Sequence, residues 1–278
     1  MINNLNQRLN IFLNNKRLSK EKFDDLKNIA EITNFNENIL KWFIFLQNIE
    51  IVGWRPKQVS KSICNILMNN DNIEIYALFC PSYLKGDGAY GFRTDDVGET
   101  TKYGLKMLNY ISNKTKELGF NIVKTSAIFF DLALEQADKS INKIDDLKIN
   151  IENFKKYIPK NIEFSLLSEK FPELLDIIGY KGIEINPLPV SNVILNRIVE
   201  RGEKFYERFG WDEEKIINRS KIIASSENIV GTFIRYNMPN SIMVYTPTML
   251  ERAQVYSGYK FETDPLAIIF PKRDIMGL

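Results

Sequence analysis

Three short apolar runs alternate with two amphipathic patterns in the middle of the chain, and this alternation limits the fold more than any other feature. The runs are "NIEIYALFC" from Asn72, "FNIVKTSAIFFD" from Phe120 and "IEFSLLSE" from Ile162. The first is almost continuously apolar, which is typical of a strand that is buried on both faces of a parallel sheet.

The segments between these runs have the periodicity of helices. "GETTKYGLKMLNYISNKTKELG" follows the first run and "DDLKINIENFKKYI" follows the second. We expect Thr100 or Thr101 to cap the first helix and Gly119 to end it. Strand, helix, strand, helix and strand in this order predict an α/β fold with a Rossmann-like, mostly parallel sheet.

Helical patterns also precede the first strand and follow the third. "ENILKWFIFLQNI" and "RPKQVSKSICNILMNN" predict a helical N-terminal extension over residues 1–70, and residues 71–278 are then the Rossmann-like domain. Near the other end, "DEEKIINRSKIIASSENIVGTFIRY" predicts one or two helices. "NSIMVYTP" and "DPLAIIFP" predict two more strands, each closed by a proline.

The residue counts restrict the chemistry. The 278 residues include no histidine, which excludes the usual neutral-pH general base and imidazole metal sites. Cys64 and Cys80 are too few for a disulfide framework or a cysteine-only zinc site, so we expect both in the core and expect no metal. No residue pattern identifies a cofactor.

The charge and hydropathy patterns restrict the partners. Lys and Arg number 37 against 35 Asp and Glu, and the resulting formal charge of +2 gives no reason to expect a nucleic acid. Neither a secretory signal nor an apolar run of about 18 residues is recognisable, so we expect a cytoplasmic chain without membrane contact.

A long connection follows the first predicted strand. It runs from Pro81 to Glu99, well beyond the usual two to six residues of a βα connection. It also starts at the carboxyl end of a strand, where open α/β sheets bind their ligands. We therefore predict catalytic roles for Lys85 and Glu99, and substrate contacts for Ser82, Tyr83, Tyr90, Arg93 and Asp96. The alternative is a solvated surface loop without function.

Other candidates lie near the ends of later elements. Asp131 ends the second strand, where it is either a proton acceptor or an N-cap of the next helix. Glu169 follows the third strand as a candidate substrate contact. Arg235 is a candidate phosphate ligand, although a solvated helix face is the alternative, and Thr246 could line the pocket or cap a helix.

The order of three motifs is similar to that of the isonitrile (isocyanide) synthases. They are "CPSYLK" from Cys80, "DDVGE" from Asp95 and "AIFFD" from Ala127, and they cover the middle of the chain. The family consists of Rossmann-like enzymes that convert the amine of an amino acid into an isonitrile with a carbon atom from a pentulose phosphate.

This resemblance implies roles for the candidate residues. Lys85 would engage the carbonyl of the sugar phosphate, and Arg93 or Arg235 would hold its phosphate. Glu99 or Asp131 would transfer protons. A buried lysine that loses its proton can attack a carbonyl without help from histidine, so this chemistry is open to the chain.

The sequence thus favours an enzyme, a transferase or synthase that acts on a small, polar, anionic metabolite such as an amino acid or a sugar phosphate. Two alternatives remain: a non-catalytic module that binds nucleic acid or protein, and a methyltransferase that uses S-adenosylmethionine. A helix-wrapped homo-oligomeric scaffold is a further hypothesis, suggested by the apolar helix "WFIFLQNI".

Overall fold

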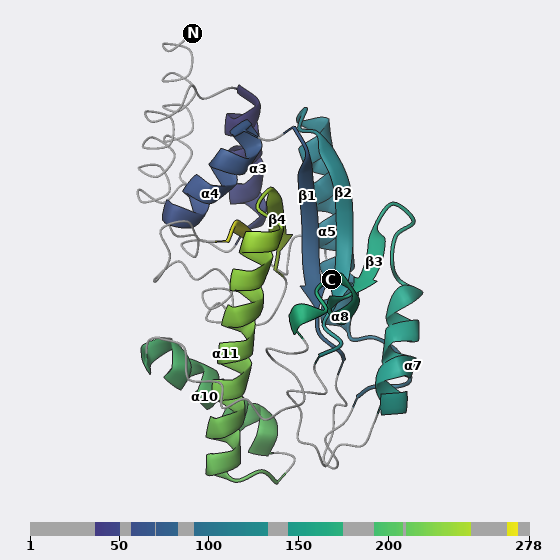
Figure 1. The fold of residues 1–278 in the computed structure, drawn as a ribbon, viewed down its shortest axis with the longest axis vertical. Helices are drawn as coiled ribbons and strands as arrows, with labels where there is room; N and C mark the ends of the chain where they lie inside the picture. The colour runs from purple at the N-terminus through teal and green to yellow at the C-terminus, as the bar shows by residue number, and fades with distance from the viewer. Residues whose placement is uncertain are drawn as a thin grey trace.

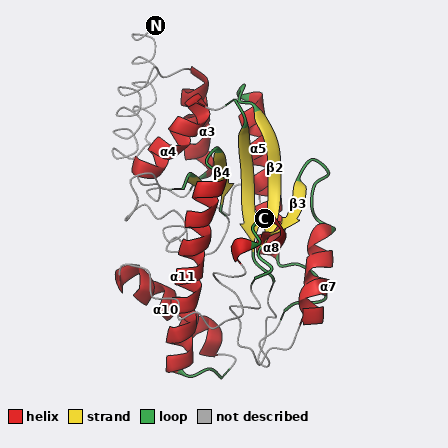
Figure 2. Ribbon diagram, viewed as in Figure 1, coloured by secondary structure: helices red, strands yellow, loops and turns green. Residues whose placement is uncertain are grey.

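The structure is a computed structural model that describes residues 37–50, 57–69, 71–82, 92–132, 144–174, 192–207, 210–245 and 266–271. These residues form a five-stranded sheet with helices around it (Figures 1 and 2). The predicted α/β fold class is therefore confirmed.

All four strand pairs of the sheet are parallel, and the strand order is β3-β2-β1-β4-β5. The strands are β1 (Ile73–Phe79), β2 (Ile122–Phe129), β3 (Glu163–Leu166), β4 (Ser241–Val244) and β5 (Ile268–Ile269). The chain moves outward from β1 through β2 to β3, and then returns to the other side of β1 with β4. This reversal makes the carboxyl end of β1 a topological switch point, the usual place for a ligand in open α/β sheets.

Helices α5 (Glu99–Glu117) and α7 (Ile144–Lys155) cover one face of the sheet. Phe154 of α7 packs against Phe79 and Phe129, with ring centroids 5.0 and 5.2 Å apart. On α5, the Ser112 hydroxyl shares a buried hydrogen bond with Thr125 of β2. Each helix thus follows one strand and packs back on the sheet, as crossover helices do.

The helices of the predicted N-terminal extension share the hydrophobic core of the sheet. They are α3 (Glu37–Ile49) and α4 (Lys57–Asn69). Trp42 is fully buried, and its indole Nε1 donates to Thr115 Oγ1 of α5 at 2.9 Å. The division of the chain near residue 70 stays a prediction.

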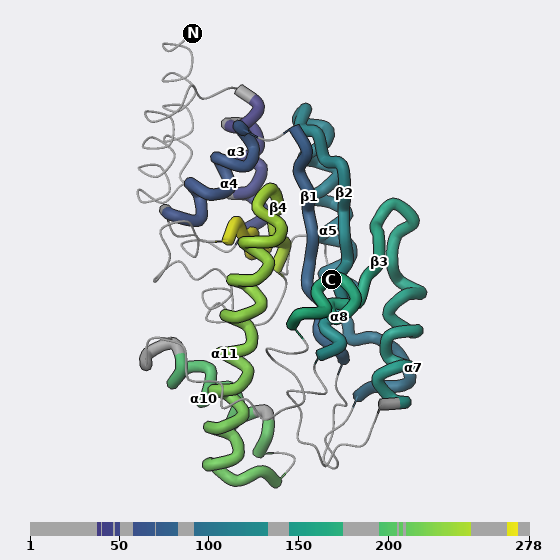
Figure 3. Tube along the Cα trace, viewed as in Figure 1, coloured from purple at the N-terminus to yellow at the C-terminus, as the bar shows by residue number. Residues whose placement is uncertain are grey.

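Two further long helices in the described residues are α10 (Asn192–Tyr206) and α11 (Glu213–Asn237), which pack against each other. Gly202 of α10 permits this approach, since a Cβ there would lie 2.8 Å from Ser220 Oγ. Helix α11 leads directly into β4 (Figure 3), so its last turn lies at the amino edge of the parallel sheet.

Three local predictions were wrong. Helix α5 begins after Gly98 rather than with a Thr100 or Thr101 cap, because the Gly98 N–H finds its acceptor in Ser82 Oγ. Strand β3 ends at Leu166, and the next four residues form α8 (Leu167–Lys170). Cys64 is buried as expected, but Cys80 is exposed.

Candidate functional site

The long connection after β1 has its two ends joined. The Arg93 N–H donates to the Ser82 carbonyl at 2.8 Å, so the chain returns to the carboxyl end of β1 after ten intervening residues. We call Ser82 and Arg93 the stem residues. Tyr83, Lys85 and Tyr90 lie between them and outside the described residues, so their roles stay predictions.

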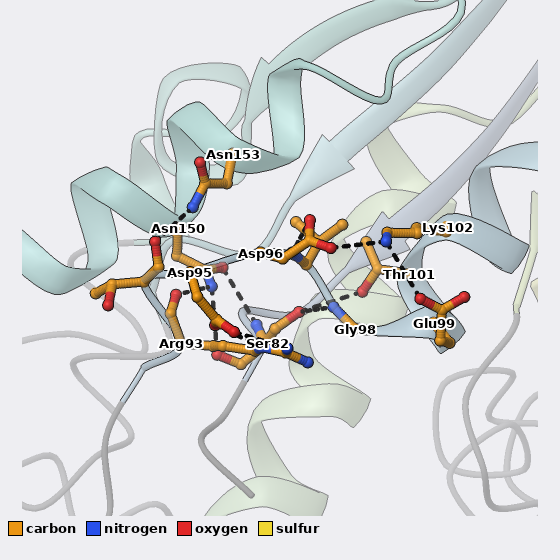
Figure 4. A network of polar contacts seen from close by, with 12 residues as sticks. Ser82, Arg93, Asp95, Asp96, Gly98, Glu99, Thr101, Lys102, Asn150 and Asn153 are labelled. Atoms are coloured by element: carbon orange, nitrogen blue, oxygen red, sulfur yellow. Dashed lines mark hydrogen bonds and ion pairs between the residues drawn. The ribbon is translucent and has the colours of Figure 1, made fainter.

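Helix α7 holds both stem residues through the fully buried side chain of Asn150 (Figure 4). Asn150 Nδ2 donates to the Arg93 carbonyl at 2.7 Å and to the Ser82 carbonyl at 3.3 Å. Its Oδ1 accepts from the Ser82 N–H at 3.2 Å. One turn later, Asn153 Nδ2 donates to the Thr94 carbonyl at 2.8 Å. Neither asparagine was among the predicted site residues.

The Ser82 hydroxyl connects the stem residues to the start of α5. Its Oγ accepts from the Gly98 N–H at 2.9 Å and lies 3.5 Å from Thr101 Oγ1. The predicted substrate contact of Ser82 would therefore compete with a hydrogen bond that starts a helix.

Arg93 is already paired. Its Nε and Nη2 donate to the two carboxylate oxygens of Asp95 at 2.7 and 2.9 Å. These hydrogen bonds raise the pKa of Arg93 and lower the pKa of Asp95 to about 2. An anionic ligand at Arg93 would meet an ion pair rather than an isolated positive charge.

Asp96 is also held in its charged form. It accepts from Lys102 Nζ, the Tyr157 hydroxyl and the Val97 N–H, each at 2.7 Å. Hydrogen bonds from Lys102 first, and then from Tyr157 and the Val97 backbone, lower the pKa of Asp96 to about 2. Lys102 Nζ also donates to the exposed Glu99 at 3.2 Å. Asp96 and Glu99 therefore lie close together and share one lysine (Figure 4).

Asp131 reaches across from the end of β2 to the start of α8. Its carboxylate accepts from the Ser168 N–H at 3.0 Å and from the Ser168 hydroxyl. This contact joins the end of β2 to the first turn of α8, the helix that contains Glu169 and Lys170. The helix that Asp131 was alternatively expected to cap lies outside the described residues.

A shallow cavity of about 160 Å³ lies on the sheet beside α8. Its lining residues come from β2, β3 and α8: Lys124, Ser126, Glu163, Phe164, Ser165, Glu169 and Lys170. Glu74 of β1 joins this group, because its Oε1 accepts from Ser126 Oγ at 2.8 Å and from Lys170 Nζ at 3.2 Å. Of the predicted site residues, Glu169 is the one that lines the cavity.

Arg235 lies away from the stem residues. It belongs to the last turn of α11, at the amino edge of the sheet, and its guanidinium lies 4.6 Å from the centre of the Tyr236 ring. Ser82 and Arg93 lie at the carboxyl edge. The structure therefore does not bring Arg235 together with the other predicted residues, and Thr246 lies outside the described residues.

None of the helices in the described residues is both long and apolar enough to cross a membrane. Within the same residues, no group of three or more Cys, Asp or Glu side chains has the arrangement of a metal site.

The chain matches no protein-family model and no curated protein sequence. Among solved structures it is similar to the PvcA protein from Pseudomonas aeruginosa, with a TM-score of 0.57 and 11% sequence identity over 85% of each chain. At this identity the likeness is one of fold. It supports the weak resemblance to isonitrile synthases that the three motifs indicated.

Proposed function

We propose that the chain is a transferase or synthase that acts on a small, polar, anionic metabolite, an amino acid or a sugar phosphate, in isonitrile formation or a related biosynthesis. The observation that carries the proposal is the fold shared with PvcA over 85% of both chains. The joined stem residues at the carboxyl end of β1 support it, because that end is a topological switch point.

Lys85 is the residue to which we assign the reaction with a carbonyl substrate. Its amine adds to the carbonyl carbon to form a C–N bond and then an imine, while the carbonyl oxygen leaves as water with the two amine hydrogens. The step needs neither an oxidant nor a histidine. A lysine in a water-poor site loses its proton more easily, which makes the amine nucleophilic at neutral pH.

Carboxylates at the same edge would move the protons. Glu99 is exposed in the first turn of α5, where it pairs with Lys102 Nζ at 3.2 Å. Asp131 is the second candidate acceptor, although its carboxylate is engaged by Ser168. Because Asp95 already pairs with Arg93, an anionic group of the substrate would bind at Arg93 alongside this ion pair.

A thermal-shift screen tests this proposal. The melting temperatures of wild type, Lys85→Ala and Lys61→Ala are measured with and without each compound. The compounds are a pentulose phosphate, aromatic amino acids, nucleotides and S-adenosylmethionine. Lys61 is an exposed lysine of α4 and serves as the matched control. A ligand at a hundred times its dissociation constant stabilises the folded state by about 2.7 kcal/mol, which is readily measured.

The expected result is stabilisation by an anionic metabolite in wild type and Lys61→Ala, and its loss in Lys85→Ala. An equal shift in all three proteins would mean that Lys85 does not contribute to ligand binding. A shift with S-adenosylmethionine alone would favour the methyltransferase alternative, and no shift with any compound would favour the non-catalytic module.

A further inference from the structure

Asn150 occupies a position in α7 where an apolar residue would be typical. It lies three residues after Leu147 and four before Phe154, and all three side chains are buried. Polar side chains are buried at a cost unless they are hydrogen-bonded. Asn150 meets this condition with three hydrogen bonds, and all three go to the main chain of the stem residues.

Ser82 and Arg93 cannot replace these hydrogen bonds by bonds to each other. Among the described residues, the Ser82 N–H and the Arg93 carbonyl each have Asn150 as their recorded partner. Without Asn150, the stem residues would keep one mutual bond, from the Arg93 N–H to the Ser82 carbonyl. An unpaired N–H and an unpaired carbonyl would remain, and both would have to recruit water.

We infer that Asn150 is a positioning residue: it fixes Ser82 and Arg93, which flank the segment that carries Lys85 in the sequence, relative to each other. This inference rests on the proposed function insofar as that segment carries Lys85. The stem residues then couple the contacts of α7 to substrate binding. If these contacts change the free energy of substrate binding, substrate binding must stabilise or destabilise the contacts by the same free energy.

Asn153 offers a matched comparison on the same helix. It is the same residue type, it is buried, and it donates to a main-chain carbonyl of the same stretch, that of Thr94. Among the described residues, however, its side chain bonds to Thr94 on the return side of the connection and to Lys156 of its own neighbourhood, and not to Ser82. Replacing it by alanine therefore removes a similar hydrogen bond without separating the two stem residues.

Native-state hydrogen exchange of the ligand-free chain tests the inference. In wild type, the Arg93 and Gly98 amides, which donate to the backbone and side chain of Ser82, are expected to be protected. In Asn150→Ala, the Arg93 amide is expected to exchange about tenfold faster relative to the Phe130 amide, a sheet amide that donates to Phe79. In Asn153→Ala, this ratio is expected to stay within about twofold of wild type.

A merely structural role would accelerate the Arg93 and Phe130 amides together, in step with the loss of global stability, and this result would overturn the inference. Equal ratios in the two variants would also overturn it. If Asn150→Ala does not fold, the wild-type measurement still decides, because an unprotected Arg93 amide is incompatible with a fixed stem. The experiment needs no ligand, so its outcome is independent of the proposed enzymatic function.

Discussion

Replacing Lys170 by methionine keeps an unbranched apolar side chain that is one atom shorter and removes the charge that faces Glu74. In the folded chain, Lys170 Nζ lies 3.2 Å from Glu74 Oε1, and the two side chains are 18% and 19% exposed. The partners come from α8 and β1, which are 96 residues apart in the sequence. Ser126 Oγ also donates to Glu74 Oε1, at 2.8 Å, and this hydrogen bond is expected to stay after the substitution.

The burial sets the expected cost. Exposed ion pairs contribute up to about 1 kcal/mol, whereas removing one partner of a fully buried pair costs about 3–5 kcal/mol. Four-fifths burial places this pair between those limits, and the hydroxyl of Ser126 compensates part of the lost contact. We expect Lys170→Met to lower the free energy of unfolding by about 2 kcal/mol, or the melting temperature by roughly 4–8 °C.

Urea unfolding followed by circular dichroism measures this loss in a double-mutant cycle with Glu74→Gln. The coupling between the two positions is expected to be about 1–2 kcal/mol, because each single variant leaves the other group buried without its charge partner. Lys148→Met is the control, since Lys148 pairs with Asp145 at 3.3 Å in an exposed position. It should change stability by less than about 0.5 kcal/mol.

Two results would refute this reasoning. One is a Lys170→Met variant as stable as Lys148→Met, which would mean that Glu74 is solvated enough to need no partner. The other is strict additivity in the cycle, which would mean that the two side chains do not interact in solution.

Phe154→Ala is expected to cost about 3–5 kcal/mol in urea unfolding, because the ring is fully buried between α7 and the sheet; a cost below 1 kcal/mol would contradict this packing. Lys102 holds the pKa of Asp96 at about 2 instead of 3.8, so this carboxylate stabilises the fold fully at pH values well above 3.8 and loses its contribution as the pH falls toward 2. The urea midpoint of wild type should therefore fall more steeply between pH 4 and 2 than that of Asp96→Asn, and equal slopes would contradict this. Gly119→Ala should lower the melting temperature more than Gly210→Ala: both glycines have positive φ angles, but a Cβ at Gly119 lies 3.1 Å from a side chain of α3, whereas at Gly210 it meets nothing within 4 Å in the described residues. The reverse order in a thermal-unfolding comparison would show that the α3 contact is not made.

The helices and strands that the structure describes in the middle of the chain could be predicted because their signals are local. The apolar run that predicts β1 and the apolar stripe that predicts α5 each lie within the element itself and depend on no distant residue. The ends of elements depend on distant partners, and there the predictions failed. The start of α5 depends on Ser82, and the turn from β3 into α8 is stabilised by Asp131.

The same distinction applies to the candidate site. Ser82, Arg93, Asp96 and Glu99 were predicted from one unusually long connection, and the structure brings all four together. Their partners were missed because hydrogen-bond partners across the fold leave little trace in a sequence.

Two signals could still have been used. Glu74 is a charged residue inside an apolar strand, and Asn150 interrupts the apolar stripe of an amphipathic helix. Each is polar at a position whose neighbours are buried, so each needed a specific partner. Arg235 was predicted as a phosphate ligand from its residue type alone. The topology shows that it lies at the other edge of the sheet, which its residue type could not indicate.

We propose that a small anionic metabolite binds at the carboxyl edge, beside the stem residues and the start of α5. The most direct test of this binding is a titration of the isotope-labelled chain with a pentulose phosphate, followed by amide NMR. Concentration-dependent shifts are expected for the amides of Ser82, Arg93 and Gly98, and none for the amide of Tyr236 at the amino edge. Shifts at Tyr236 without any at the stem residues, or no shifts at saturating concentrations of every anionic metabolite that is tested, would contradict it.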